Sequence, residues 1–301
     1  ASSTFISTLP PSWMSVPRPA MLVAMVTAPG LPASATICAS FSCWRAFRTL
    51  WGIFARFSSS ASCSDFSIDV VPTIMSRGLV PTSIEFMDQL SVQTSCAYLN
   101  ESLPYEEAGA MLLLEIDGNN PDQVEAELIA VGELCEEHGA IEVYVAENST
   151  TKERIWSVRR NIAEAFKVYS PIQSLEDIVV PMASIPEIIP ELERLSEKYG
   201  MKIPCYGHAG DGNLHATLVK DPEMDMDTWH KNEDLCLREL YKITADLGGK
   251  ISGEHGIGIK RKSYLKDVIN PIELKLMQSI KSAWDPNNIM NPGKIFDLEP
   301  A

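Results

Sequence analysis

The stretch Tyr206-Gly-His-Ala-Gly-Asp-Gly-Asn-Leu-His215 places two histidines among three glycines. Glycine allows positive φ angles and close backbone approach, so this spacing predicts a tight turn between two strands. Beyond the turn, residues 213–219 alternate as a strand does, which puts His215, Thr217 and Val219 on one face. Gly-Asp-Gly-Asn is also the composition of an ordinary hairpin turn, so the stretch alone leaves a purely structural interpretation open.

A second glycine-rich stretch, Ser252-Gly-Glu-His-Gly-Ile-Gly258, adds a glutamate beside a histidine. Together, His208, His215 and Glu254 make a candidate site for a metal held by two imidazoles and one carboxylate. Such a site keeps a position open for substrate or water, and its ligands suit Zn, Fe or Mn. Spacing alone leaves the metal site and a structural role for these residues equally open.

His255 follows the third candidate ligand directly. Histidine exchanges protons near neutral pH, which suits a general base at this place. The combination indicates oxidation or hydration of a small oxygenated substrate rather than a binding module. Gly256-Ile-Gly258 is not a dinucleotide-binding fingerprint, because the required strand, glycine spacing and later acidic residue do not line up.

A third motif, Asp285-Pro-Asn-Asn-Ile-Met-Asn-Pro-Gly-Lys-Ile-Phe296, follows the first two. In this order the three motifs resemble the C-terminal part of FAD-linked oxidases. The relevant branch holds D-lactate dehydrogenases, glycolate oxidase flavin subunits and D-2-hydroxyglutarate dehydrogenase, within the vanillyl-alcohol-oxidase superfamily. The resemblance covers about Val70 to Ala301. It implies FAD and a divalent metal as cofactors, and oxidation of a small D-2-hydroxy acid to the 2-oxo acid.

The resemblance also implies roles for single residues. His208, His215 and Glu254 resemble the metal ligands, and His255 resembles the base that takes the substrate hydroxyl proton. The hydride from the same carbon would pass to the flavin N5. Arg159, in the stretch Ile155-Trp-Ser-Val-Arg-Arg160, resembles the arginine that binds the substrate carboxylate.

Guanidinium chemistry agrees with that role, because it grips a carboxylate through two parallel hydrogen bonds. The alternative for Arg159 is a solvated charge on a helix surface. Asn213 and Asn291 resemble residues near the flavin or the substrate. Lys294 either faces the flavin or is a surface lysine.

The sequence departs from the family before residue 70. Family members bind FAD mainly through a preceding domain with a glycine-rich pyrophosphate loop, and this sequence shows no such loop. We therefore expect a fragment, a truncated gene product or a separately encoded subunit, with a domain at 70–301. Residues 1–69 have an atypically low charge, and lysine first appears at Lys152. We interpret them as a non-native reading frame; a disordered leader or targeting peptide is the alternative.

Composition limits the partners. The net charge is −15, which argues against nucleic acid. No apolar run is long enough for a transmembrane helix. The seven cysteines form no CxxC pair, so we expect reduced thiols and a cytoplasmic protein. The aromatic stretch Trp44–Phe57 leaves peripheral membrane contact open. The basic run Lys260-Arg-Lys262 either attracts carboxylates or flavin phosphates or is a solvated helix turn.

Periodicity predicts an α+β fold: an antiparallel sheet covered by helices on one face, the ferredoxin-like cap domain of FAD-linked oxidases, with a C-terminal helical segment. Capping residues, prolines and glycines set the expected boundaries. Strands are expected at residues 110–117, 140–146 and 176–180, besides the hairpin at 208–215. Helices are expected at residues 121–138, 151–169, 185–199, 225–247 and 272–284.

The sequence therefore favours the substrate- and metal-binding domain of an FAD-dependent D-2-hydroxy-acid dehydrogenase of the lactate or glycolate type. Its electron acceptor would be an electron-transferring flavoprotein, a quinone or an iron–sulfur subunit. Two alternatives stay open. One is a non-catalytic interaction subunit of a flavoprotein complex, and the other is a metal-dependent hydrolase that uses the same three ligands with a bound water.

Overall fold

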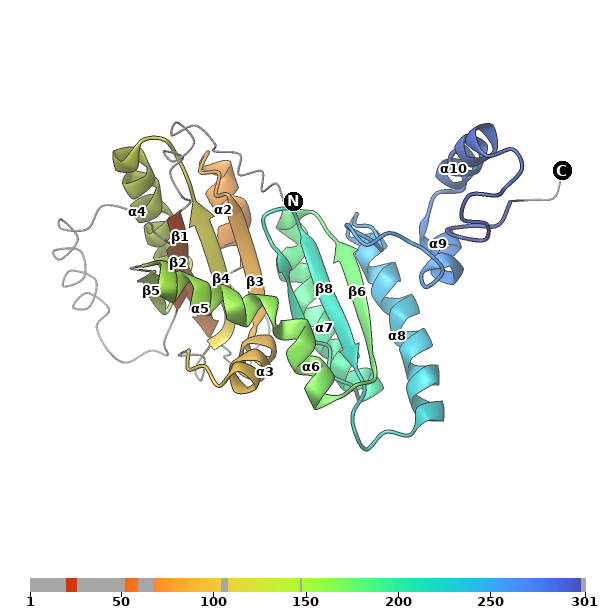
Figure 1. Cartoon of the computed structure of the whole chain (residues 1–301), viewed down its shortest axis with the longest axis horizontal. Coiled ribbons are helices and arrows are strands. Elements are labelled where there is room, and N and C mark those ends of the chain that lie inside the picture. Colours follow the sequence, from red (N-terminus) through yellow and green to blue (C-terminus); the bar gives the residue numbers. More distant parts are fainter. Residues whose placement is uncertain (1–19, 26–51, 59–67, 104–107, 147, 299–301) are drawn as a thin grey trace, which may run out of the picture.

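An eight-stranded sheet forms the centre of the molecule (Figure 1). The structure, a computed structural model, describes residues 68 to 298 apart from 104–107 and 147, together with the backbone of 20–25 and 52–58. The strands are β1 (Ala20–Met25), β2 (Gly52–Ser58), β3 (Ser83–Asp88), β4 (Ala108–Ile116), β5 (Glu142–Val145), β6 (Gln173–Val179), β7 (Cys205–His208) and β8 (Asn213–Val219). Their order in the sheet is β1-β5-β2-β4-β3-β7-β8-β6, and all pairings but β1–β2 are antiparallel.

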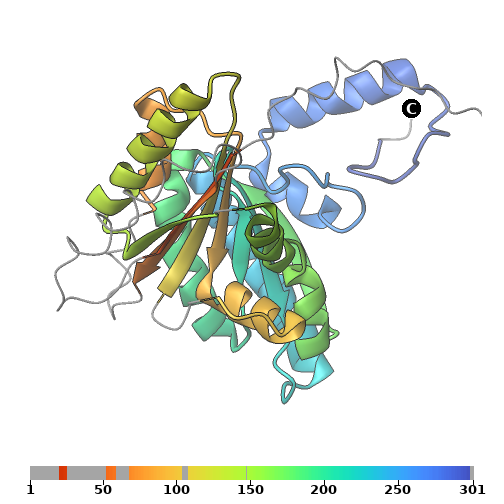
Figure 2. The same cartoon turned by 60° about the vertical axis from the view of Figure 1, so that its left-hand side comes forward.

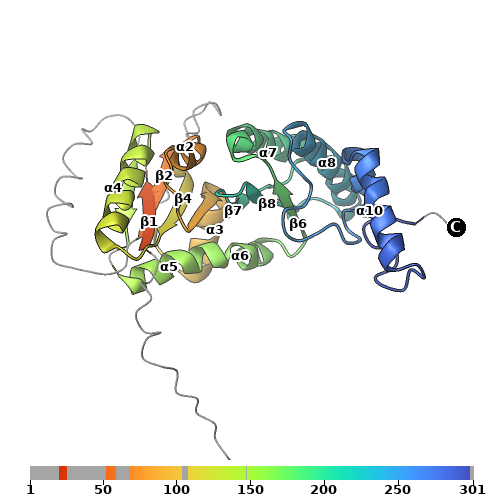
Figure 3. The same ribbon diagram turned by 90° about the horizontal axis from the view of Figure 1, so that it is seen from above.

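Helices cover both faces of this sheet (Figure 3). One layer holds α2 (Val70–Ser76), α4 (Pro121–Glu137), α7 (Ile185–Tyr199) and α8 (Met226–Asp246), and the other holds α3 (Gln89–Leu99), α5 (Ser149–Arg160) and α6 (Ile162–Tyr169). The short 3-10 helix η3 (Met182–Ser184) precedes α7. Two further helices, α9 (Lys262–Val268) and α10 (Pro271–Trp284), extend beyond the β6 edge and α8 (Figures 1 and 2).

The two layers follow from alternation along the strands. Phe86 and Leu112 face the core of the α2–α4–α7–α8 layer, whereas their neighbours Met87 and Met111 face the core of the α3–α5–α6 layer. Successive strand residues point to opposite faces, so a strand buried on both sides is mostly apolar. Strand β4 shows this, since seven residues in a row, from 110 to 116, are buried.

Four of the expected helices are confirmed, because their end signals are strong. The side chain of Asn120 accepts hydrogen bonds from the backbone of Asp122 and Gln123 at 3.0 and 3.4 Å and so caps α4. Asp225 caps α8 in the same way, through a 2.9 Å bond from the backbone of Thr228. Helix α7 ends at Gly200, whose φ of 64° lies in the left-handed region that favours glycine. Helix α10 matches the expected helix at 272–284.

Two expectations about the helices are wrong. The helix expected at 151–169 is divided into α5 and α6 at Asn161, whose side-chain nitrogen donates to the Ser157 carbonyl at 2.8 Å. Asparagine competes in this way with the backbone for hydrogen bonds and so interrupts a helix. The expectation that helices cover one face is also wrong, because α3, α5 and α6 cover the second face.

Some sequence-based expectations concern residues that are mostly outside the described part. Of residues 1–69, the structure describes only the backbone of β1 and β2 and residues 68–69, so the reading-frame hypothesis and the membrane contact of Trp44–Phe57 stay predictions. Four cysteines lie in the described part, Cys96, Cys135, Cys205 and Cys236, and all four are buried. Among the described residues, no helix combines the length and apolar character that crossing a bilayer requires.

Candidate active site

Strand register brings a row of polar residues onto one face of the sheet. Glu85 of β3 lies opposite His208 of β7, and His208 lies opposite Asn213 of β8. Two residues further along β8, His215 lies opposite Asp177 of β6. Residues that are cross-strand partners or two apart in a strand share a face. All five side chains therefore point to the side covered by α3, α5 and α6.

Asp177 holds the loop that carries Glu254 and His255. Its Oδ2 accepts hydrogen bonds from Ser252 Oγ at 2.9 Å, from the Glu254 amide at 3.0 Å and from the His255 amide at 2.7 Å. Burial alone would raise the pKa of Asp177, but these hydrogen bonds outweigh it and leave the pKa below its ordinary value. The charged carboxylate thus fixes the loop against β6.

Gly253 explains why this loop is rich in glycine. A Cβ at this position would lie 2.6 Å from Asn213 Nδ2 and 3.1 Å from Asp177 Oδ1. Both neighbours are buried, so a larger residue would push the loop away from the sheet. The close approach that the glycine allows brings Glu254 next to the two strand histidines.

The three residues predicted to bind a metal come together in space. His208, His215 and Glu254 each offer a ligand atom within 4.8 Å of the others. His215 Nε2 lies 3.7 Å from Glu254 Oε1, and the two imidazole rings are 6.1 Å apart. A second group with the same spacing consists of Asp177, His215 and His255, so His215 is common to both. In the described structure, His215 Nδ1 and Asp177 Oδ1 are buried and have no hydrogen-bond partner.

The environment keeps His215 neutral. Burial lowers its pKa to about 4, and the nearby positive charge of Arg159 acts in the same direction. The His255 ring stacks on the His215 ring at 5.2 Å, and the His255 side chain is 37% exposed. A neutral imidazole is the form that binds a metal, while an accessible imidazole can exchange a proton with a small molecule.

Arg159 lies in the same cluster. It was predicted to bind the substrate carboxylate, and in the structure it pairs with Glu85. It is 9% exposed and therefore is not a solvated surface charge. Its Nε donates to Glu85 Oε2 at 2.9 Å, its Nη2 forms an ion pair with the same oxygen at 2.7 Å, and its guanidinium lies 5.1 Å from the centre of the Tyr206 ring. The edge of the guanidinium formed by Nε and Nη2 is thus taken by Glu85. The Nη1–Nη2 edge is the one that remains for a carboxylate.

The two asparagines predicted to lie near the flavin are placed differently. Asn213 is buried beside Gly253, and its Oδ1 has no hydrogen-bond partner in the described structure. Asn291 is exposed in the segment after α10, where its carbonyl accepts from the Lys294 amide at 3.3 Å. Lys294 is exposed in the same segment. A 2.8 Å hydrogen bond from the Ile295 amide to the Gly258 carbonyl joins that segment to the end of the second motif.

The basic run after the second motif is largely engaged by the sheet. Lys260 Nζ lies 2.5 Å from Glu176 Oε1, and Arg261 Nε lies 3.3 Å from Glu176 Oε2. Glu176 is fully buried in β6. The cations therefore anchor the loop to the strand whose next residue, Asp177, holds the other end of that loop.

Sequence reasoning missed Glu85 and Asp177. Each is a buried acidic residue within a strand, Glu85 in Ser83-Ile-Glu-Phe-Met-Asp88 and Asp177 in Gln173–Val179. A carboxylate inside such a strand is a usable signal, because charges are rarely buried without a partner.

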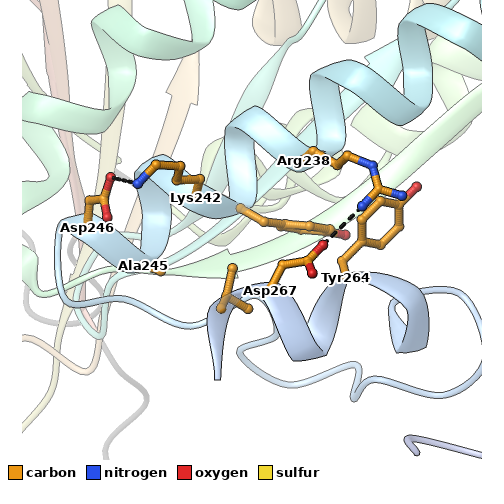
Figure 4. Close-up of a pocket in the computed structure, with 8 residues that line it drawn as sticks. Arg238, Lys242, Ala245, Asp246, Tyr264 and Asp267 are labelled. Atoms are coloured by element: carbon orange, nitrogen blue, oxygen red, sulfur yellow. Dashed lines mark hydrogen bonds and ion pairs between the residues drawn. The ribbon is translucent and has the colours of Figure 1, made fainter. Parts of the chain in front are cut away.

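A separate cavity of about 540 Å³ lies between α8 and α9 (Figure 4). Its cations are already paired: Arg238 Nη1 lies 3.0 Å from Asp267, and Lys242 Nζ lies 2.7 Å from Asp246. None of the residues that line it belongs to the histidine cluster. The cavity therefore adds nothing to the chemistry of the candidate site.

Comparison with known proteins shows the family of this chain. Residues 54–295 match the family described as FAD linked oxidases, C-terminal domain, and the chain belongs to that family. It is 34% identical over 233 residues to a D-lactate dehydrogenase of Anaerostipes hadrus, covering 76% of this chain and 49% of the relative. It is 32% identical over 232 residues to glycolate oxidase subunit GlcD of Bacillus subtilis, covering 77% and 48%. The chain thus spans about half the length of these relatives.

Two solved structures share the fold. A p-cresol methylhydroxylase with substrate bound superposes with a TM-score of 0.59 at 16% identity, covering 82% of this chain and 53% of the other. A 4-ethylphenol oxidase from Gulosibacter chungangensis gives 0.58 at 14% identity, covering 83% and 53%. These similarities establish the architecture. The family match begins at residue 54, ahead of the domain start expected at residue 70.

Proposed function

We propose that this chain is the substrate- and metal-binding part of an FAD-dependent dehydrogenase that oxidises a small D-2-hydroxy acid, of the lactate or glycolate type, to the 2-oxo acid. The observation that carries the proposal is the convergence of His208, His215 and Glu254, which lie on two strands and a separate loop. Relatives named D-lactate dehydrogenase and glycolate oxidase support the substrate class. The electron acceptor would be an electron-transferring flavoprotein or an iron–sulfur subunit, on a cytoplasmic or membrane-peripheral protein.

The donor atoms fit a divalent cation. Two imidazoles and one carboxylate within 4.8 Å of one another suit Zn, Fe or Mn and leave positions open. His208 Nδ1 donates to Glu85, so its Nε2 is the nitrogen left to ligate. His215 is neutral near pH 7 and has a buried nitrogen with no hydrogen-bond partner in the described structure. These features support a cation site more than a solvated polar cluster.

The described residues support flavin binding less than they support the cation site. Asn213 lies beside Gly253 at the cluster, whereas Asn291 is exposed in the segment after α10. FAD is assigned to the protein through its family, and we place most of the flavin-binding residues in the half of the relatives' length that this chain does not match.

The chain's own residues would bind and orient the substrate and move one proton. A bound cation would lower the pKa of the substrate hydroxyl, and FAD would accept the hydride. Arg159 would hold the substrate carboxylate through the guanidinium edge that faces away from Glu85. The accessible imidazole of His255 would take the hydroxyl proton. Asp177 would keep His255 in reach by holding its backbone amide.

Metal content is the first test. After reconstitution with Zn, Fe or Mn, we expect elemental analysis to find about one metal per wild-type chain. The double variant His208→Ala, Glu254→Ala should lose it, because two of three ligands are gone. A matched control is His230→Ala, Glu233→Ala, a histidine–glutamate pair on α8 outside the cluster, of which the histidine is exposed and the glutamate half-buried. Wild-type protein that stays metal-free, or a site variant that keeps its metal, contradicts the proposed site.

Flavin reduction separates this proposal from its two alternatives. We expect D-lactate or glycolate to bleach added FAD once the flavin-binding part is supplied, and Arg159→Met to abolish the bleaching. An interaction subunit would never bleach flavin with any hydroxy acid. A hydrolase would release product without a redox change.

A further inference from the structure

We propose that Glu85 is the positioning residue of the candidate cation site: a single buried carboxylate orients His208 as a ligand and fixes Arg159 beside it. The inference rests on the proposed function, since it concerns the same site. Glu85 is 2% exposed and lies in β3 between the buried residues Ile84 and Phe86. A carboxylate is costly to bury unless both its oxygens are paired, so its partners account for its presence.

Both carboxylate oxygens of Glu85 are used within the site. Oε1 accepts from His208 Nδ1 at 2.6 Å, and Oε2 accepts from Arg159 Nε at 2.9 Å and pairs with Arg159 Nη2 at 2.7 Å. The residue opposite Glu85 in the strand pairing is His208 itself, so the contact is built into the β3–β7 register. The contact between Glu85 and His208 therefore depends on the sheet, and Arg159 reaches it from α5.

The hydrogen bond to His208 determines which nitrogen can ligate. Because Nδ1 donates its proton to Glu85, Nε2 keeps its lone pair for a cation. A carboxylate behind a ligating histidine fixes the tautomer and ring orientation and makes the imidazole a stronger donor. Losing such a partner lowers metal affinity by about 10- to 100-fold.

The same carboxylate also orients Arg159. Because the Nε–Nη2 edge is bound to Glu85, the guanidinium is held over the Tyr206 ring, 5.1 Å from its centre. The Tyr206 ring lies 5.5 Å from the ring of His215. Glu85 thus sets the distance between a cation ligand and an anion-binding group. A 2-hydroxy acid needs both, with its hydroxyl at the cation and its carboxylate at the arginine.

Other carboxylates on this face hold different partners. Asp177 accepts from the backbone and hydroxyl of the Ser252–His255 segment. Glu115 of β4 accepts from Trp156 Nε1 at 2.9 Å and also pairs with Lys152. Among the described residues, Glu85 is the carboxylate within hydrogen-bond distance of a candidate ligand's ring nitrogen. Glu115 therefore serves as a matched control: it is also buried, on the same face, but outside the cluster.

The test is the affinity of the 301-residue chain for Co²⁺, a cation whose visible absorption reports its ligands; the measurement needs no flavin. We expect Glu85→Gln to weaken Co²⁺ binding by about 10- to 100-fold, because glutamine cannot accept from His208 and Arg159 together. Glu85→Asp keeps the charge on a shorter side chain, so its Co²⁺ affinity should lie between those of the wild type and Glu85→Gln. Glu115→Gln should bind as wild type does.

A double-mutant cycle distinguishes positioning from a general loss of structure. If Glu85 acts through His208, Glu85→Gln has no further effect on Co²⁺ affinity in a His208→Ala background. An equal loss in both backgrounds would show a merely structural role and overturn the inference. Thermal unfolding of each variant checks that the chain is folded. If Glu85→Gln is not folded, the same cycle is measured with Glu85→Asp.

The outcomes for the inference and for the proposed function differ. Wild-type protein that binds neither Co²⁺ nor Zn²⁺ overturns the cation site, and Glu85 then has no ligand to position. Wild-type protein that binds Co²⁺ while Glu85→Gln binds it equally tightly overturns the inference alone. Only weakened binding that depends on His208 supports both.

Discussion

Gly212 is the residue on which the turn between the two motif strands depends. Its φ is +80°, and a Cβ at this position would lie 1.9 Å from the carbonyl oxygen of Val180. The Gly212 carbonyl in turn accepts from the Val180 amide at 3.0 Å. The turn thus packs directly against the end of β6. This contact fixes the turn, and His208 and His215 lie on either side of the turn.

We predict that Gly212→Ala lowers the free energy of unfolding by about 3 kcal/mol or more, because it adds a backbone clash to an unfavourable φ. Urea denaturation followed by circular dichroism measures the change. Gly256→Ala is the matched control: its φ is +81°, but no atom lies within 4 Å of the added Cβ. That variant should lose only about 1–2 kcal/mol. Equal losses in both would show that the approach to Val180 has no energetic effect.

At the residue scale, the candidate ligands could be predicted because each lies in a glycine-rich motif. His208, His215 and Glu254 stand out from the sequence without knowledge of the fold. Glu85 and Asp177 do not, because their roles depend on which strands are neighbours. The pairings β3–β7 and β6–β8 join residues far apart in the chain, and local periodicity carries no information about them.

At the scale of elements, Glu239 links α8 to α7. Its carboxylate accepts from Lys198 Nζ at 2.5 Å and from Tyr199 Oη at 2.8 Å, and it also pairs with Arg194 at 2.9 Å. The hydrogen bond from Lys198 is the largest of the effects that lower the pKa of Glu239 to about 2. In the folded protein this carboxylate therefore holds its proton more weakly than in the unfolded chain.

A carboxylate with a lowered pKa stabilises the fold above its unfolded pKa, and the contribution disappears as the pH falls through the folded pKa. We predict that Glu239→Gln costs about 1 kcal/mol at pH 6, a value that allows for solvent screening of the 27% exposed side chain. The cost should vanish between about pH 4.5 and pH 2. Urea denaturation at several pH values measures it. Glu187→Gln, on the exposed part of α7, is the control. A cost that is constant with pH would contradict the linkage.

Elements with strong end signals could be predicted, and those without them could not. Helices α4, α7 and α8 have capping side chains or terminal glycines that the sequence shows directly. Strand β3 and helix α3 follow each other at Asp88 with no glycine or proline between them, and neither was expected. The layer of α3, α5 and α6 on the second face of the sheet also could not be predicted, because it depends on tertiary packing. Helices α3 and α6 pack against each other although they are far apart in the sequence.

At the scale of the whole molecule, α10 presents an apolar stripe to the outside. Ile272, Leu276, Ile280 and Trp284 are spaced four apart and are between 53% and 80% exposed, and no residue of α10 is buried. The helix extends from the end of the molecule beyond α8 (Figures 1 and 2). Residues at this spacing lie along one side of a helix, so they form a continuous surface. Exposed apolar surfaces of this kind favour association.

We predict that the isolated chain associates with increasing concentration and that Leu276→Gln, Ile280→Gln suppresses the association. Analytical ultracentrifugation over a range of concentrations measures it. Because both side chains are exposed, the variant should change the unfolding free energy by less than about 0.5 kcal/mol for each substitution. The control, Lys275→Gln, Ser279→Gln, changes exposed polar residues of the same helix and should associate as wild type does. If the apolar variant associates as strongly as the control, the contact surface lies elsewhere, and the stripe on α10 does not drive association.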